Sequence, residues 1–161
     1  MDISHKTTPD LTADTAVDLV DTRFLESLLG YNTRRATLVI IGAFLERMEQ
    51  FNLRPVDFSV ASLIVHNPGI TSRQLCATLG LLPPNLVGLI NTLEKRGLIT
   101  RRPHPNDGRA MGLHPTPAGI ALMQVAEQEA FDVEAQAAST LTATERKTLI
   151  RLLQKVYLTS T

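Results

Sequence analysis

The sequence has few or none of the residues that several common protein classes need. It contains no tryptophan, and aromatic residues make up 4% of its 161 positions, which argues against an aromatic platform for single-stranded nucleic acid. Its one cysteine, Cys76, excludes a disulfide within the chain and a zinc site made of cysteines alone. No apolar run approaches the roughly 18 residues of a membrane span, and the polar N-terminus lacks a signal-peptide pattern. We therefore expect a cytoplasmic protein without membrane contact.

Catalytic and metal-binding patterns are also missing. The sequence holds no glycine-rich phosphate loop, no nucleophile elbow and no paired histidine and carboxylate constellation, so we predict no enzyme activity and no cofactor. The four histidines show neither i, i+4 pairing nor a carboxylate at ligand spacing, so we expect no metal site. Cys76 is interpreted as a buried structural thiol, with a redox sensor as the alternative.

What the chain does have is a divided charge on one domain's worth of residues. The formal net charge is zero, yet residues 1–30 hold six acidic against two basic residues, and residues 71–114 hold six basic against two acidic ones. A basic segment on a neutral protein gives the local electrostatic footprint that nucleic-acid binding needs. The alternative is an ordinary solvated charge run.

The basic segment begins with a helix-turn-helix pattern. Thr71 and Gln74 form a capping box that predicts a helix start, and Gly80 predicts its end. Two prolines then fit only the first turn of a second helix, residues 83–96, which Gly97 should terminate. Two short helices at this spacing are typical of a helix-turn-helix.

The second helix divides into two faces at about 100° per residue. The face assigned to the core carries Leu82, Leu86, Leu89, Ile90 and Leu93. The opposite face carries Pro84, Asn85, Gly88, Asn91, Thr92 and Lys95. Short, neutral, hydrogen-bonding side chains of this kind suit base edges or phosphates in a major groove, whereas the alternative is an ordinary solvated helix face.

A β-hairpin is predicted after the second helix. Residues 98–102 alternate as a strand, residues 104–109 have turn composition, and residues 111–114 can return as a second strand. The pattern therefore predicts a winged helix-turn-helix. Arg109 would lie at the wing tip, able to enter a narrow minor groove, and Asp107 could pair with it. Asp-Gly at a hairpin tip is also simply favourable turn chemistry.

The run from Leu53 to Gly119 resembles the MarR (multiple antibiotic resistance regulator) family of bacterial transcription regulators. The most specific part is LEKRGLITRRPHPNDGRA, residues 93–110. The resemblance implies a DNA-recognition helix after the turn, a wing whose Asp107 and Arg109 form or organise the minor-groove contact, and an obligate dimer built from the terminal helices. The chain departs from many relatives by having Leu82 at the recognition-helix cap, and Gly88 and Thr92 on its exposed face.

These features together predict contacts with a double-stranded DNA operator. The candidate DNA-contacting residues are Ser72, Arg73, Pro84, Asn85, Gly88, Asn91, Thr92, Lys95, Arg101, Asn106, Asp107 and Arg109.

The terminal segments are predicted to form long dimerisation helices. Residues 21–51 are helix-periodic and apolar around much of their circumference, so we expect them to pack against a second copy of the chain. Thr116 and Thr142 are expected to begin two further helices. The predicted fold class is mostly α with a small β-hairpin wing. The predicted domains are an N-terminal arm (1–20), a dimerisation and effector helix (21–54), a winged helix-turn-helix lobe (55–115) and C-terminal dimerisation helices (116–161).

A candidate effector site follows from the first long helix. Arg34 and Arg35 flank its apolar stripe beside Tyr31, where buried arginines could hold a small aromatic carboxylate or phenolic compound. A structural ion pair or snorkelling to solvent is the alternative. The resemblance places Phe58 and His66 near such a pocket as well, although His66 could equally be a helix C-terminal cap.

The sequence thus predicts a ligand-responsive repressor that binds a pseudo-palindromic duplex operator as a homodimer. Two alternatives stay open. One is a winged-helix regulator controlled by oxidation of Cys76, and the other is a winged-helix protein-interaction module without sequence-specific DNA binding.

Overall fold

The computed structural model describes residues 20–104 and 107–158, and for residues 104 and 107–110 it describes the backbone. The chain divides into two compact units, one ending at Ala36 and the other beginning at Thr37. The elements, in chain order, are α1 (Arg23–Glu26), α2 (Leu29–Met48), the 3-10 helix η2 (Glu49–Phe51), α3 (Pro55–His66), β1 (Ile70–Thr71), α4 (Ser72–Leu79), α5 (Pro83–Lys95), β2 (Ile99–His104), β3 (Asp107–Pro115), α6 (Pro117–Ala137) and α7 (Ala143–Leu158). The predicted fold class, mostly α with a small β-hairpin wing, is confirmed.

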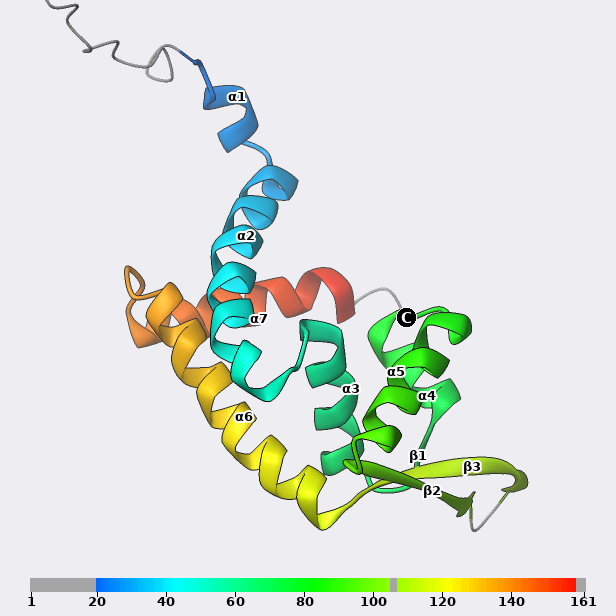
Figure 1. Ribbon diagram of the computed structural model, residues 1–161. Helices are drawn as coiled ribbons and strands as arrows, with labels where there is room; N and C mark the ends of the chain where they lie inside the picture. Colours follow the sequence, from blue (N-terminus) through cyan, green and yellow to red (C-terminus); the bar gives the residue numbers. More distant parts are fainter. Residues whose placement is uncertain (1–19, 105–106, 159–161) are drawn as a thin grey trace, which may run out of the picture. The chain divides into compact units, whose positions relative to one another are not determined.

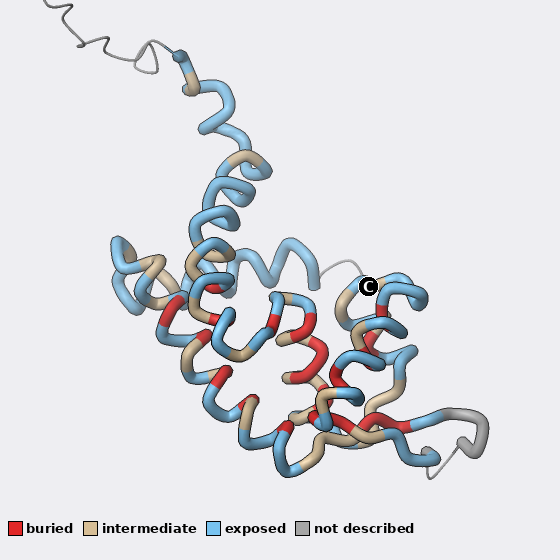
Figure 2. Tube along the Cα trace, in the orientation of Figure 1, coloured by how far each residue is buried: buried red, intermediate tan, exposed pale blue. Residues whose placement is uncertain are grey.

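The core of the larger unit is built around α3, which lies between α6 and the pair α4 and α5 (Figure 1). Figure 2 shows buried positions on the facing sides of these helices. The largest fully buried side chains are Met48, Val60, Ile64, Leu75, Leu86, Leu93, Leu113 and Met123. Within the described residues no single helix is long and apolar enough to cross a membrane, and only the pair α4 and α5 passes that test jointly, with a bend of 116° between them.

The predicted helix starts are confirmed by their capping hydrogen bonds. Thr71 Oγ1 accepts the backbone N–H of Gln74 at 3.3 Å, and Gln74 Oε1 accepts that of Thr71 at 2.9 Å. Thr116 Oγ1 accepts the N–H of Gly119 at 3.0 Å. Gly80 ends α4 in the left-handed conformation, with φ of 63°, which glycine adopts without steric cost. Local side-chain chemistry therefore determines where these helices begin and end.

The sheet is larger than the sequence predicted. Its strand order is β1-β3-β2 and every pair is antiparallel. The hairpin strands extend into the predicted turn 104–109, since His104 is paired with Asp107 after an irregularity in the register. The third strand, β1, pairs Ile70 with Leu113. A strand of two residues is too short to show an alternating pattern, which is why the sequence did not reveal it.

The predicted helix 21–51 is interrupted. α1 ends at Glu26 and α2 begins at Leu29. The side chain of Asn32 donates at 2.7 Å to the carbonyl oxygen of Glu26, an acceptor that a continuous helix would have paired internally. It also donates at 2.8 Å to the Leu28 carbonyl, which accepts the Asn32 backbone N–H as well. Periodicity alone could not show this break, because the apolar positions keep their spacing across it.

The start of α6 rests tightly on the residues that precede β2. Thr116 N–H donates to the Leu98 carbonyl at 3.0 Å, and Thr116 Oγ1 donates to the Gly97 carbonyl at 2.6 Å. A Cβ atom at Gly119 would lie 2.0 Å from the Leu98 carbonyl oxygen. This approach fixes the base of the wing against α6, and it requires glycine at position 119.

We predict that Gly119→Ala lowers the free energy of unfolding by about 1–3 kcal/mol, because the added methyl must push backbone apart. Thermal unfolding followed by circular dichroism measures the loss. Gly88→Ala is the matched control, since a Cβ there meets nothing within 4 Å and alanine favours a helix by about 1 kcal/mol over glycine. Equal melting temperatures for Gly119→Ala and the unaltered protein would contradict the close contact.

Candidate nucleic-acid interface

The outward face of α5 is the centre of the candidate interface. The buried residues Leu86, Ile90 and Leu93 face the core. At 100° per residue, the side of the helix opposite to them carries Pro84, Gly88, Asn91 and Lys95, all exposed. Asn85 and Thr92 on one flank of this strip, and Val87 on the flank that adjoins α4, are exposed as well. The predicted contacts on α5 are therefore all accessible from one side.

Two apolar residues belong to this surface rather than to the core. Leu82 was assigned to the core from its spacing, and this is wrong, because its side chain is 69% exposed. It is the N-cap of α5 and has extended backbone angles, φ −76° and ψ 139°, so the helical period does not apply to it. Val87 was in neither predicted set, and it is 55% exposed on the flank of the outward face that adjoins α4.

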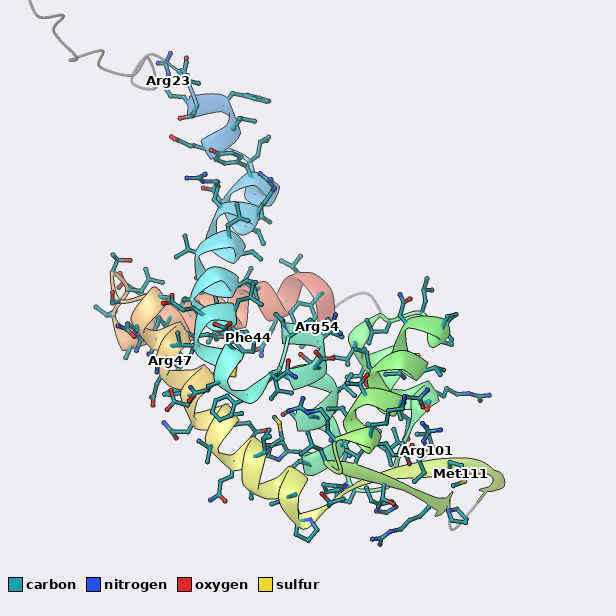
Figure 3. The ribbon with its side chains drawn as sticks, in the orientation of Figure 1. Arg23, Phe44, Arg47, Arg54, Arg101 and Met111 are labelled. Carbon is teal, nitrogen blue, oxygen red and sulfur yellow. The ribbon has the colours of Figure 1, made fainter. Side chains whose placement is uncertain are left out.

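Arg101 on β2 is held against α5 (Figure 3). Its Nε lies 3.2 Å from Oε2 of Glu94, and its Nη2 donates to Oδ1 of Asn91. The ion pair is partly exposed, so it contributes at most about 1 kcal/mol, but it fixes the guanidinium beside the helix. Thr92 Oγ1 donates to the Gly88 carbonyl at 2.9 Å. The side-chain oxygens of Asn91 and Thr92 are thus already engaged within the protein.

A second arginine has a structural role. Arg96, at the end of α5, donates to the carbonyl oxygens of Asn52 and Phe51 at 2.8 and 2.7 Å. These bonds tie the end of α5 to the end of η2. Nearby, Arg54 Nε donates to Asp57 at 2.9 Å across the first turn of α3, which raises the pKa of Arg54 above its usual value.

The exposed cations of the winged-helix lobe, residues 55–115, lie at the edges of the α5 face and on the wing. Arg73 and Lys95 are exposed in the described part of the lobe, and so is Arg102, which was not among the predicted contacts. Neighbouring residues on a strand point to opposite faces, so Arg102 points away from α5 when Arg101 points toward it. This alternation is the signal that could have identified Arg102.

The predicted wing contacts lie mostly outside the described side chains. Asn106 falls outside the described residues. The backbone of Asp107 and Arg109 belongs to β3, whereas their side chains are outside what the structure describes.

The start of α4 adjoins the start of α5. Ser72 and Arg73 are exposed in the first turn of α4. A hollow of about 300 Å³ between the two helices is lined by Ser72, Arg73, Cys76, Pro83, Leu86 and Val87. Cys76 is a free thiol of intermediate burial that packs against the core.

The candidate effector residues on α3 make separate contacts. Phe58 packs edge-on against Phe44, with ring centroids 5.3 Å apart. His66 Nε2 lies 2.9 Å from Oε1 of Glu127 on α6, and Ser62 Oγ donates to the same oxygen at 2.7 Å. The sequence could not show this cluster, because its partners are more than sixty residues apart.

The other candidate effector residues lie in the first turns of α2. Tyr31 is half-buried, and Arg34 and Arg35 are both exposed in the single chain, so the buried placement assumed for them is wrong there. The reason is that these turns present apolar and charged residues alike to solvent. Among the described residues, no three His, Cys, Asp or Glu side chains gather at metal-binding distances.

Comparisons with known proteins agree with this geometry. The sequence profile of the MarR family matches residues 51–110. The solved structure of the transcriptional repressor CouR bound to a 23-mer DNA duplex is 32% identical, covering 85% of this chain and 97% of that one with a TM-score of 0.79. CouR from Rhodococcus jostii RHA1 bound to p-coumaroyl-CoA is 27% identical, covering 82% and 93% of the two chains with a TM-score of 0.75.

A curated relative points the same way. A protein assigned as a transcriptional regulator of the hcr operon in Thauera aromatica is 29% identical over 130 residues, which are 80% of this chain and 78% of that protein. The similar proteins are transcription regulators rather than enzymes. With its winged helix-turn-helix, this chain belongs to the MarR family of DNA-binding transcription regulators.

Proposed function

We propose that the protein is a homodimeric repressor in the bacterial cytoplasm that binds a pseudo-palindromic duplex operator. The observation that carries the proposal is the outward face of α5. It bears no charged side chain before Glu94, and Arg73 and Lys95 are exposed near its two ends. Such a face can enter a major groove while the cations contact phosphates on either side. The wing would lie over the adjoining minor groove, and the two half-site centres would be about 34 Å apart.

The similarity to CouR supports this assignment of the face. CouR was solved on a DNA duplex, and the likeness extends over nearly all of its length. We assign contacts with the operator to the α4 and α5 residues Ser72, Arg73, Pro84, Asn85, Gly88, Asn91, Thr92 and Lys95. Arg101 is a positioning residue for Asn91 as well as a candidate contact, and the wing adds Asn106, Asp107 and Arg109.

Exposed apolar residues at the ends of the chain support a homodimer. No residue of α7 is buried. Its exposed large apolar side chains are Leu149, Ile150, Leu152, Leu153, Val156, Tyr157 and Leu158. Apolar side chains exposed in this number on one helix favour an interface, because leaving apolar surface in water costs about 25 cal/mol per Å². α1, the start of α2 and the connection between them expose Phe24, Leu25, Leu28 and Leu29.

Two carboxylates of the C-terminal helices have shifted pKa values, in opposite directions. Thr142 N–H donates to Glu145 Oε2 at 2.8 Å, which lowers the pKa of Glu145. Glu134 is exposed but adjoins an apolar hollow of about 270 Å³ between α6 and α7, and the partial loss of water around its carboxylate raises its pKa. The capping bond of Glu145 therefore stabilises α7 at pH values above the ordinary carboxyl pKa, and this stabilisation is lost as the pH falls. Protonation of Glu134 at low pH has the opposite effect, because it removes the cost of holding a charge beside apolar side chains.

We infer that a small aromatic acid or phenolic compound releases the operator. CouR binds p-coumaroyl-CoA, whose acyl group is phenolic. In this chain Tyr31, Arg34 and Arg35 can offer a ring and two cations to such a ligand. Phe58 and His66 of the larger unit are separate candidate contacts. Release requires that the ligand bind the form unable to span two half-sites more tightly than the DNA-binding form.

Replacing Arg109 with alanine should weaken binding to the duplex upstream of the protein's own gene by about tenfold or more, because a wing arginine contributes a base-edge or phosphate contact of about 1–3 kcal/mol. The slope of log affinity against log salt should fall by about 0.9 for each lost phosphate contact. Fluorescence anisotropy at two salt concentrations measures both. Lys147→Ala removes the same charge from α7 and should bind as the unaltered protein does; unchanged affinity of Arg109→Ala would exclude the wing contact.

Arg35→Ala should impair the response to effector more than the binding of DNA. The concentration of p-coumarate or p-coumaroyl-CoA that releases half of the duplex should rise about tenfold, because a charge-assisted hydrogen bond is lost. Release of the duplex is measured by the fluorescence anisotropy of the preformed complex as effector is added. Arg23→Ala serves as a control for the charge. If Arg35→Ala reduced duplex affinity and effector response equally, the arginine would not belong to an effector site.

Val156→Glu should weaken dimerisation by at least about tenfold, since a buried unpaired carboxylate opposes association. Gln154→Glu introduces the same charge on the same helix at a polar position, and it should leave the dimer intact. Sedimentation velocity distinguishes monomer from dimer for each variant. Dimers of equal stability in both variants would show that α7 is not part of the interface.

A further inference from the structure

Val87 is an apolar residue on the surface that faces the operator. It is 55% exposed and does not belong to the buried core cluster. It lies beside Pro84 and Gly88 of the outward strip, on the flank that adjoins α4, and around the missing side chain of Gly88 the space is open to 4 Å. This flank of the α5 face is therefore a small apolar patch beside exposed backbone, over which another surface can approach closely.

The cationic side chains that commonly contact guanine are absent from α5 before its last turn. The commonest base contact of proteins is an arginine or lysine that donates to the two guanine acceptors in the major groove. In α5, which the structure describes completely, no lysine or arginine precedes Lys95. Residues near the start of a recognition helix make the base contacts, so Lys95 in the last turn suits a phosphate better.

The polar groups on the strip are also restricted. Asn91 already accepts a hydrogen bond from Arg101 through its side-chain oxygen, and the Thr92 hydroxyl donates to the Gly88 carbonyl. The two-bond contact that asparagine can make with adenine needs this oxygen as an acceptor, so its bond with Arg101 competes with that contact. The large apolar side chain that α5 exposes beside these polar groups is that of Val87.

Thymine carries the one apolar group that a base pair of unmodified DNA presents in the major groove, its C5 methyl. We propose that Val87 selects thymine in each half-site by direct contact with this methyl group. The inference rests on the proposed function, because it assigns a base to the same face. Arg73 and Lys95, exposed near the two ends of the strip, supply charge complementary to the phosphates and favour a duplex over a neutral protein surface as its occupant.

The proposal can be tested by removing only the C5 methyl group of thymine from the duplex. The upstream duplex, trimmed to the region that the protein protects, is synthesised with deoxyuridine in place of thymidine at one symmetric pair of positions at a time. At one of these pairs of positions, the substitution should lower the affinity of the unaltered protein for the duplex about fourfold per half-site, or about fifteenfold for both half-sites. This is the loss expected when one buried methyl contact is removed on each side. Val87→Ala should bind the unmodified duplex correspondingly less tightly and should show no further loss with deoxyuridine there.

Val56→Ala is the matched control, because Val56 is also an exposed valine of the lobe but lies at the start of α3; this variant should retain the full deoxyuridine effect. Equal affinity for every deoxyuridine duplex, or an undiminished effect in Val87→Ala, would overturn the assignment of Val87 and leave operator binding itself standing. Failure to bind the unmodified upstream duplex above a shuffled sequence would instead overturn the proposed function, and the assignment with it.

Discussion

The packing of one side of α5 against the core determines what the protein can present to a duplex. Leu86, Ile90 and Leu93 are almost completely buried, and the hydrophobic effect holds that side inward at about 1.5–3 kcal/mol for each side chain. Because the helix is rigid, the opposite strip is then fixed as well. The position of the outward face of α5 is therefore determined by the core, and substitutions that alter the core would displace this face as well.

Polar bonds connect this rigid lobe to the helices proposed for dimerisation. Arg96 joins the end of α5 to η2, the short helix that follows α2. Glu127 on α6 holds His66 and Ser62 at the end of α3. Rotation at either connection would carry α5 with it, so a ligand that alters the terminal helices could change the separation of two recognition helices without touching the DNA. The differential affinity that release requires can arise there.

Much of the fold could be predicted from local signals. The threonine caps, the two prolines that open α5 and the glycines after α4 and α5 act within a few residues, so spacing reveals them. Contacts between distant residues could not be predicted. The hold of Glu94 on Arg101 depends on how β2 folds back toward α5, and no pattern in the chain encodes that distance. The misplacement of Leu82 has a related cause, since a capping residue is outside the helical period.

The central claim is that two copies of α5 enter successive major grooves of one duplex. A hydroxyl-radical footprint of the unaltered protein on the DNA upstream of its own gene tests it most directly. The account predicts two protected tracts related by a two-fold axis, with centres about one helical turn, or 10–10.5 base pairs, apart. A single asymmetric tract, or no protection beyond that of a shuffled sequence, would contradict it.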